Sequence, residues 1–375
     1  MDFNLTVEQK MIKDSAKKFF SKELTKEHIR ELQEKNVEVE KDFWQKIAEL
    51  GWLGLTFSQE YKGEEMGLME LATLYEECGR ALMPTVFYSN MAAAFCILNG
   101  GRTDQKKELL SAISEGKMRI TMAITESQAI NDLNYLKTNA RLINGKYYIS
   151  GEKLFVQNTV SADYLIVAAR TEENTSDTAI TLFLIDKSSK GLTFEALKTF
   201  GLDSQSEVIL ENVEVPMDQI IGETGDAKKI IKHTADQTTA LQCVEMVGGA
   251  QEIIKMTANY VRNRIQFKHP IGSFQAVQHH MTKMAMDIEG AYYAAYNAVW
   301  RLSEGKSCAK EIAIAKAWIG NAYRDTAIMA HQLYGGIGYA LEYDLHLYSN
   351  RAKTTGIWQG TSDYHYQKLA DELGM

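Results

Sequence analysis

Apolar residues recur at helical spacing through the first third of the chain. Ile12, Ala16 and Phe19 fall three or four positions apart, which places them on one face of an α-helix. The same stripe returns over residues 67–82, again with polar residues between the apolar ones. This pattern predicts an N-terminal helical domain over residues 1–118.

The period of the pattern changes at Arg119, where apolar runs become short and strand-like. Segments such as YLIVAA at 164–169 are rich in branched apolar residues, and Asn144-Gly145 separates two of these segments. An Asn-Gly pair between strand-like runs is a strong signal for a β-hairpin. We expect a middle β domain, a barrel or a sandwich, over residues 119–226.

Helical spacing resumes in the last part of the chain. The pattern predicts one helix over about 234–263, a second over 273–304 with Ser273 as its N-cap, and a third over 309–334. Together with a final helical stretch these segments predict a four-helix bundle over residues 227–375. The expected fold class is therefore α+β.

Composition narrows the classes of function. The 375 residues are 45% hydrophobic and 24% charged, with a formal net charge of −8, which suits a globular protein and not a nucleic-acid-binding surface. No apolar run reaches the roughly 20 residues that a membrane-spanning helix needs. The start MDFNLTVEQK lacks the pattern of a secretory signal, and the four cysteines form no CxxC pair. We expect a cytoplasmic protein without membrane contact.

The segment from Tyr260 to Met281 combines cations, amides and an aromatic ring at a turn between two helices. The polar and aromatic positions are Arg262, Arg264, Gln266, Phe267, Gln275 and Gln278. Fixed cations and amide donors beside a ring suit a dinucleotide with a pyrophosphate. The alternative is a surface turn whose arginines are solvated.

This segment, RIQFKHPIGSFQAVQH, resembles the signature of the flavin-dependent acyl-CoA dehydrogenase family. Three further blocks support the resemblance in the family's order: MAITES at 122–127, GEKLFVQNTVSAD at 151–163, and AHQLYGGIGYALEYDLHLYSNRAK followed by IWQGTSDYH. The resemblance covers essentially the whole chain. It implies helices, a β domain and a helical bundle in that order, with FAD bound across a subunit interface.

The resemblance also implies which residues bind FAD. In the β domain these are Ile124, Thr125, Asn131, Phe155 and Gln157, which would cover one flavin face and bond its polar edge. In the helical part they are Arg264, Gln266, Phe267, Gln275, Gln332, Gly335, Gly336 and Thr361. The sequence departs from the family where TESQAIND lacks the usual proline and glycine. For Phe155 the alternative is an ordinary strand core residue.

The residue that normally removes the substrate's α-proton is absent. Most members of the family have a glutamate in a Y-E-G-T motif, and this chain has Trp358-Gln359-Gly360-Thr361 instead. An amide cannot accept a proton at neutral pH. A second position used by some members is Thr238 here.

Glu245 is the candidate that remains. It shares a helix face with Leu241 in an otherwise apolar stretch, so we expect it to be buried with a raised pKa, as suits a general base. It also resembles a sub-group of the family with a glutamate at this point, some of whose members form two-subunit assemblies. The alternative is a structural carboxylate paired with an arginine or lysine of another helix.

The resemblance implies that the substrate is an acyl-CoA. Its contacts would be Asp236, Leu241, Trp358, Gln359 and Gly360, although Asp236 could equally be an ordinary first-turn acid. The histidines form no metal-binding spacing, and no metal is expected.

Four hypotheses follow. The first is an FAD-dependent acyl-CoA dehydrogenase that uses Glu245 and passes electrons to an electron-transfer flavoprotein, as a homotetramer or as a heterotetramer with a paralogous subunit. The second is a partner subunit that lacks its own base. The third is a base-free flavin enzyme with another reaction on a CoA ester, such as elimination. The fourth is a non-enzymatic helical scaffold.

Overall fold

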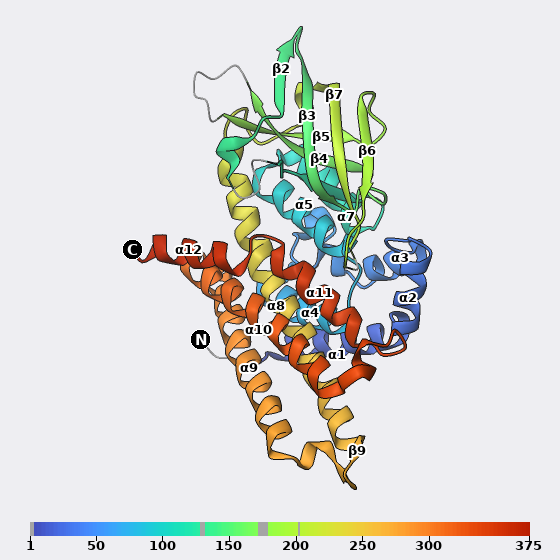
Figure 1. Cartoon of the computed structure of the whole chain (residues 1–375). Helices are drawn as coiled ribbons and strands as arrows, with labels where there is room; N and C mark the ends of the chain where they lie inside the picture. Colours follow the sequence, from blue (N-terminus) through green and yellow to red (C-terminus); the bar gives the residue numbers. More distant parts are fainter. Residues whose placement is uncertain (1–3, 128–131, 172–178, 202) are drawn as a thin grey trace.

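The computed structural model describes residues 4–127, 132–171, 179–201 and 203–375. A β-sheet occupies one end of the molecule, and long helices from the last third of the chain extend to the other end (Figure 1). The N-terminal helices pack between them and along the long helices. This arrangement confirms the expected order of helices, β domain and helical bundle.

The N-terminal part begins with the capping box that Thr6 and Gln9 form, in which each side chain accepts a hydrogen bond from the other residue's backbone N–H. Its elements are α1 (Val7–Glu23), α2 (Lys26–Glu34), α3 (Lys41–Glu49), the 3-10 turns η1 (Trp52–Gly54) and η2 (Gln59–Tyr61), α4 (Leu68–Ala81), α5 (Val86–Gly100), α6 (Thr103–Gln105), the π-helical turn η3 (Lys106–Leu110) and α7 (Ser111–Ser114).

The sheet is open. Its elements are β1 (Ile120–Ala123), the 3-10 turn η4 (Leu133–Tyr135), β2 (Asn139–Ile143), β3 (Lys146–Gln157), β4 (Tyr164–Thr171), β5 (Ile180–Asp186), β6 (Leu192–Leu197), β7 (Gln205–Pro216), the 3-10 turn η5 (Met217–Gln219) and β8 (Ile220–Ile221). The strand order is β6-β7-β3-β2-β4-β5-β8, with β1 parallel to β4. Because β6 and β8 do not pair among the described residues, the expectation of a barrel is wrong.

Strand β4 is buried on both faces, which explains its continuous apolar sequence. Leu165 and Val167 face the smaller core inside the β domain, while Ile166 and Ala168 between them join the large core shared with the helices. The predicted hairpin between β2 and β3 is confirmed, with Asn144 and Gly145 both at positive φ.

The C-terminal part contains the longest helices. Its elements are α8 (Ala227–Asn263), the short strands β9 (Ile265–Gln266) and β10 (His269–Pro270), the 3-10 turn η6 (Ile271–Ser273), α9 (Gln275–Ser303), α10 (Ala309–Tyr334), the 3-10 turn η7 (Gly335–Tyr339), α11 (Leu345–Ile357) and α12 (Ser362–Glu372). Within the described part of the chain, no helix is both long and apolar enough to span a bilayer.

Two expectations about helix ends are wrong. The first long helix begins at Ala227, seven residues before the start predicted at 234. Ser273 is not the N-cap of α9, because Phe274 occupies that position. The Ser273 hydroxyl instead donates to the Pro270 carbonyl, 2.7 Å away, and closes η6.

Helices α4 and α8 approach each other backbone to backbone. A Cβ on Gly79 of α4 would lie 1.8 Å from the Glu245 carbonyl oxygen, and a Cβ on Gly248 of α8 would lie 1.9 Å from the Glu76 carbonyl oxygen. Glycine is therefore required at both points of the crossing. This contact sets the depth at which the middle of α8 lies in the molecule.

We expect Gly79→Ala to lower the free energy of unfolding by about 3 kcal/mol, because the two backbones must move apart to admit the methyl group. Urea unfolding followed by circular dichroism measures this. Gly356→Ala is the control, since no heavy atom lies within 4 Å of a Cβ there and alanine favours helix α11 by up to about 1 kcal/mol. A Gly79→Ala protein within about 0.5 kcal/mol of wild type would contradict the expectation.

Candidate active site

The segment after β1 lies beside the bend of β3, where Phe155 is exposed. Thr125 follows β1, and its carbonyl accepts a hydrogen bond from the Leu154 backbone N–H at 2.9 Å. Strand β3 has a bulge between Lys153 and Val156. Within this bulge Phe155 has φ 57° and remains 50% exposed. A large apolar residue held exposed in left-handed backbone is typical of a ligand-contacting position.

The remaining predicted flavin residues of the β domain are less informative. Ile124 is half-buried beside Thr125. Gln157 ends β3, and its carbonyl accepts from the Thr121 hydroxyl at 2.7 Å. Asn131 lies outside the described residues.

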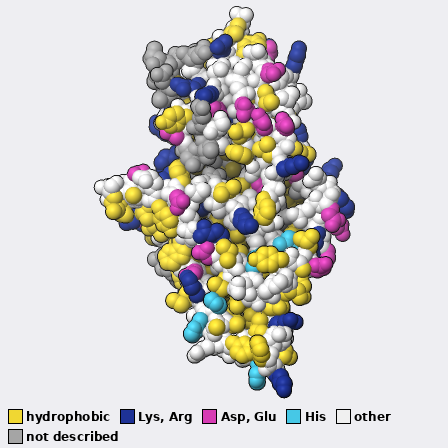
Figure 2. Space-filling view, viewed as in Figure 1, with side chains coloured by type: hydrophobic (Ala, Val, Ile, Leu, Met, Phe, Trp, Pro, Cys, Tyr) yellow, Lys and Arg dark blue, Asp and Glu magenta, His cyan; other side chains and the backbone are white. Residues whose placement is uncertain are grey.

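A second group of predicted residues lies at the tip between α8 and α9. Arg264, Gln266, Phe267 and Gln275 are all exposed there, and Phe267 is 85% exposed with φ 52°. Figure 2 shows hydrophobic, basic and histidine side chains together at this lower end of the molecule. Among the described residues, the Arg264 guanidinium forms no ion pair. The tip thus offers a cation, amides and an aromatic ring to a ligand.

The turn after α10 lies close to this tip. Tyr334 stacks on Tyr260 near the end of α8, with ring centroids 4.1 Å apart, and the Tyr260 hydroxyl donates to the Tyr334 carbonyl. Gly335 has φ 66°, and a Cβ on Gly335 or Gly336 would meet no heavy atom within 4 Å. Backbone with open space in front of it suits close approach of a phosphate. Gln332 is exposed on the last turn of α10.

One chain does not bring these two groups together. The tip and the β domain lie at opposite ends of the molecule in Figure 1, separated by the 37 residues of α8, which span about 55 Å. We call Ile124, Thr125 and Phe155 the flavin wall and the exposed residues between α8 and α9 the tip, after their predicted roles, and one chain keeps these two partial sites apart.

The segment after α11 carries the position where a catalytic glutamate would be expected. Trp358 ends α11, and Gln359 follows with φ 57°. His365 Nε2 donates to the Gln359 carbonyl at 2.8 Å. Burial lowers the pKa of His365 to about 4, so the ring is a neutral donor. Gly360 has φ 100°, and Thr361 caps α12 with its hydroxyl.

Glu245 is buried in the centre of the bundle, as expected from the sequence. It is 2% exposed, and Leu241, one turn earlier on the same face of α8, is 1% exposed. Burial raises the pKa of Glu245 to about 7, although the charges of Arg351 and Lys316 act in the opposite direction. A carboxyl group with this pKa can exchange protons near neutral pH.

The carboxylate also has a charged neighbour on another helix. Arg351 of α11 places Nη1 3.6 Å from Glu245 Oε1, a distance beyond that of a good hydrogen bond. Its Nη2 donates to the Met83 carbonyl at 2.8 Å. Within the described structure, Glu245 Oε1 and Arg351 Nη1 have no hydrogen-bond partner. Glu245 thus has both the raised pKa expected of a general base and the cationic neighbour expected of a structural carboxylate, so both alternatives remain.

Asp236 pairs on its own helix. Its carboxylate lies 2.8 Å from Lys232 Nζ, one turn earlier on α8. Because α8 begins at Ala227, Asp236 is in the third turn, and the alternative of a first-turn acid is wrong. Its contact with CoA stays a prediction.

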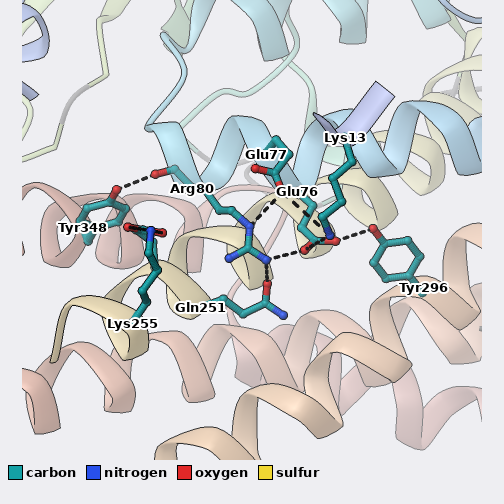
Figure 3. Close-up of polar contacts among 9 residues, drawn as sticks. Lys13, Glu76, Glu77, Arg80, Gln251, Lys255, Tyr296 and Tyr348 are labelled. Carbon is teal, nitrogen blue, oxygen red and sulfur yellow. Dashed lines mark hydrogen bonds and ion pairs between the residues drawn. The ribbon is translucent and has the colours of Figure 1, made fainter. Parts of the chain in front are cut away.

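Sequence reasoning missed a partly buried polar network centred on Glu76 and Arg80 of α4 (Figure 3). Glu76 of α4 accepts from Lys13 of α1 at 2.9 Å and from the Tyr296 hydroxyl of α9 at 2.7 Å. Arg80 binds Glu76, Glu77 and Gln251 of α8. The signal in the sequence was two adjacent acidic residues within an apolar stripe. The network stabilises the α4–α8 crossing and so holds Glu245 in place.

Family models match almost the entire chain. The acyl-CoA dehydrogenase N-terminal domain matches residues 6–117, the middle domain matches 121–213 and the C-terminal domain matches 229–374. The chain belongs to the acyl-CoA dehydrogenase family. It is an oxidoreductase, and members of this family are FAD-dependent. The expected family and cofactor are therefore confirmed.

Relatives of this acyl-CoA dehydrogenase family member match over full length. It is 30% identical to the probable acyl-CoA dehydrogenase YngJ of Bacillus subtilis (strain 168), over 100% of both chains. It is 28% identical to acryloyl-CoA reductase (NADH) of Anaerotignum propionicum, over 100% of this chain and 96% of the relative.

Solved structures share the fold. Butyryl-CoA dehydrogenase from Megasphaera elsdenii has a TM-score of 0.94 at 26% identity, over 100% of both chains. A chain from the structure of the electron transferring flavoprotein of Acidaminococcus fermentans has a TM-score of 0.93 at 30% identity, over 100% of this chain and 99% of that chain. The FAD complex of PigA has a TM-score of 0.93 at 25% identity, with the same coverage.

The residues present fit FAD. The exposed Phe155 offers an apolar face to a flat ring, and the open backbone at Gly335 and Gly336 offers room for a phosphate. Arg264 supplies an exposed positive charge at the tip.

The surroundings of Glu245 predict a pH-dependent effect of Arg351→Met. A carboxyl group with a raised pKa in the folded state stabilises the fold most below pH 4.5, and this stability is lost as the pH rises to the folded pKa. Removing the cation raises the pKa further, so the free energy of unfolding should continue to fall between pH 7 and pH 9. The extra loss is about 1.4 kcal/mol for each pKa unit.

Urea unfolding at pH 6, 7.5 and 9 measures this effect. Arg351→Met/Glu245→Gln is the control, because it lacks the titrating group while other groups that titrate in this range are retained. An equal decline in the single and the double variant would show that Glu245 does not titrate there.

Proposed function

We propose that this chain catalyses α,β-dehydrogenation of an acyl-CoA thioester and the reverse reduction, with Glu245 as the acid–base group and an electron-transfer flavoprotein as the electron partner. The observation that carries the proposal is the Glu245 carboxyl group, which is buried on the Leu241 face of α8, has a pKa of about 7 and has one oxygen without a hydrogen bond to any described residue. Membership of the family supports the reaction class.

The chemistry divides between the cofactor and the chain. When bound, FAD supplies the acceptor for the β-hydrogen and its electron pair. The α-carbon–hydrogen bond breaks heterolytically, and its proton passes to the Glu245 carboxylate. Gln359 can donate from its amide but cannot take this proton. Trp358 and Leu241 would pack around the acyl group.

The pKa of Glu245 supports both directions of the reaction. Above about pH 7 the carboxylate can accept the α-proton, and below it the carboxylic acid can return a proton to the α-carbon. The relative named acryloyl-CoA reductase and the neighbour named butyryl-CoA dehydrogenase point to CoA esters in these two directions. The neighbour from an electron transferring flavoprotein structure supports the electron partner.

The separation of the two partial sites supports an assembly. The flavin wall of one chain would meet the tip of a second chain, which supplies Arg264, Gln266 and Phe267, with Gln275, Gln332 and the Gly335 turn nearby. The second chain is either another copy or a paralogous subunit, as in a homotetramer or a heterotetramer.

The Glu245–Arg351 pair supports a second candidate function. If the carboxylate serves only to neutralise the buried Arg351, the chain lacks a base of its own. It would then act as a partner subunit, or as a flavin enzyme with a different reaction on a CoA ester.

Anaerobic titration of the FAD-loaded protein with a panel of acyl-CoAs tests the proposal through bleaching of the flavin band. We expect bleaching by wild type, with a rate that rises through about pH 7. Glu245→Gln should lower this rate by about 10²- to 10⁴-fold, and Glu245→Asp by less, because the shorter side chain retains the proton-exchanging group.

Glu23→Gln is the control, since Glu23 at the end of α1 is a largely buried carboxylate that pairs with Lys46 of α3, outside the residues predicted to bind substrate or flavin. It should bleach at the wild-type rate. Unchanged bleaching in Glu245→Gln would exclude Glu245 as the base. No bleaching in wild type with FAD firmly bound would favour the second candidate.

A further inference from the structure

The ion pair between Lys153 and Glu126 is buried inside the β domain. The Lys153 side chain is 0% exposed, and its Nζ lies 2.6 Å from Glu126 Oε1. The same Nζ donates to the Ile124 carbonyl at 3.3 Å. Glu126 also accepts hydrogen bonds from the backbone N–H groups of Lys137, at 2.6 Å, and Thr138, at 3.1 Å. The pair thus joins the end of β1, the start of β2 and the bulge of β3.

We propose that this pair is the positioning device for the flavin: it fixes the bulge that presents Phe155 and the Ile124–Thr125 backbone to the isoalloxazine ring. FAD affinity and the redox potential of the flavin then depend on two residues that do not touch it. The inference rests on the proposed flavin wall.

The bulge is what turns Phe155 outward. Residues two apart in a regular strand share a face, yet Lys153 is fully buried and Phe155 is half exposed. The register of β3 on β7 shifts between Lys153, opposite Val208, and Val156, opposite Ser206. A bulge of this kind re-aims a side chain next to a functional site.

The Lys153 ammonium lies beside this bulge. In the next residue, the Leu154 backbone N–H donates to the Thr125 carbonyl. This bond and the ammonium group together hold the bulge against the segment after β1. Without the ammonium group, the left-handed backbone at Phe155 would lose the contact that opposes its relaxation into a regular strand.

Stability alone does not explain the pair. Burial lowers the pKa of Lys153 to about 8, even though Glu126 opposes this shift. Removing two charges from water costs about as much as their attraction returns, and an apolar pair in such a place is often as stable. The position of the pair, directly behind the wall, gives it a role that an apolar pair could not fill.

The test is FAD binding by the variant Lys153→Met/Glu126→Gln. It removes both charges and leaves no unpaired buried ion, and the glutamine oxygen still accepts from one of the two backbone N–H groups of Lys137 and Thr138 just before β2. We expect thermal stability close to that of wild type, an FAD dissociation constant raised by about tenfold, and a shifted flavin potential and visible spectrum. Reconstitution of the apoprotein with FAD, followed by flavin fluorescence and potentiometry without substrate, measures these.

Two further variants complete the design. Lys146→Met/Glu214→Gln removes an exposed ion pair between β3 and β7 and should leave FAD binding unchanged. Glu126→Asp keeps both charges but shortens the carboxylate side chain. Its FAD dissociation constant should lie between those of wild type and Lys153→Met/Glu126→Gln. If Lys153→Met/Glu126→Gln does not fold, the FAD affinity of Glu126→Asp tests the inference in its place.

The outcomes separate this inference from the proposed function. Wild-type FAD affinity, potential and spectrum in a folded Lys153→Met/Glu126→Gln protein would overturn the positioning role and leave the proposed reaction untouched. If only Glu126→Asp folds, wild-type FAD affinity, potential and spectrum in that variant would likewise overturn the positioning role. Failure of wild type to bind FAD would instead overturn the proposed flavin function and this inference with it.

Discussion

The rest of the structure depends on the close approach of helices α4 and α8. Gly79 and Gly248 let the two backbones meet at distances that no side chain would allow. The network of Lys13, Glu76, Arg80 and Gln251 then fastens the crossing from its polar side (Figure 3). Because α8 passes through the molecule at this depth, its middle is buried on all sides and Glu245 has no access to bulk water.

Buried charge is the common theme of the interior. Lys153, Lys316 and Arg351 are all buried, and each has a defined partner: Glu126 for Lys153, the Thr355 carbonyl for Lys316, and the Met83 carbonyl together with Glu245 for Arg351. Such groups contribute little net stability, since desolvation offsets their attraction. They do define which strands and helices lie together, and they shift pKa values toward the range in which proton transfer is useful.

Two exposed aromatic candidates lie at separate ends of the molecule. Phe155 lies on the β domain and Phe267 on the tip of the bundle, and both have left-handed backbone and large exposed rings. Exposed aromatic rings on constrained backbone are costly in water, and a ligand or a second chain that covers them recovers apolar contact. The length of α8 prevents the two ends from serving one ligand within a single chain.

The sequence by itself determined the features that depend on neighbouring residues. The Asn144-Gly145 hairpin and the extent of α10 follow from local periodicity and turn chemistry, and the structure confirms them. Burial of Glu245 was also predictable, because an apolar stretch of helix surrounds it.

Only the tertiary structure decided the partners. Arg351 faces Glu245, and Lys153 faces Glu126, because separate elements pack at particular depths and registers, which no local pattern encodes. The same reason explains why the barrel and the Ser273 N-cap were wrongly expected. The open edges of the sheet and the 3-10 turn that contains Ser273 depend on how distant segments meet.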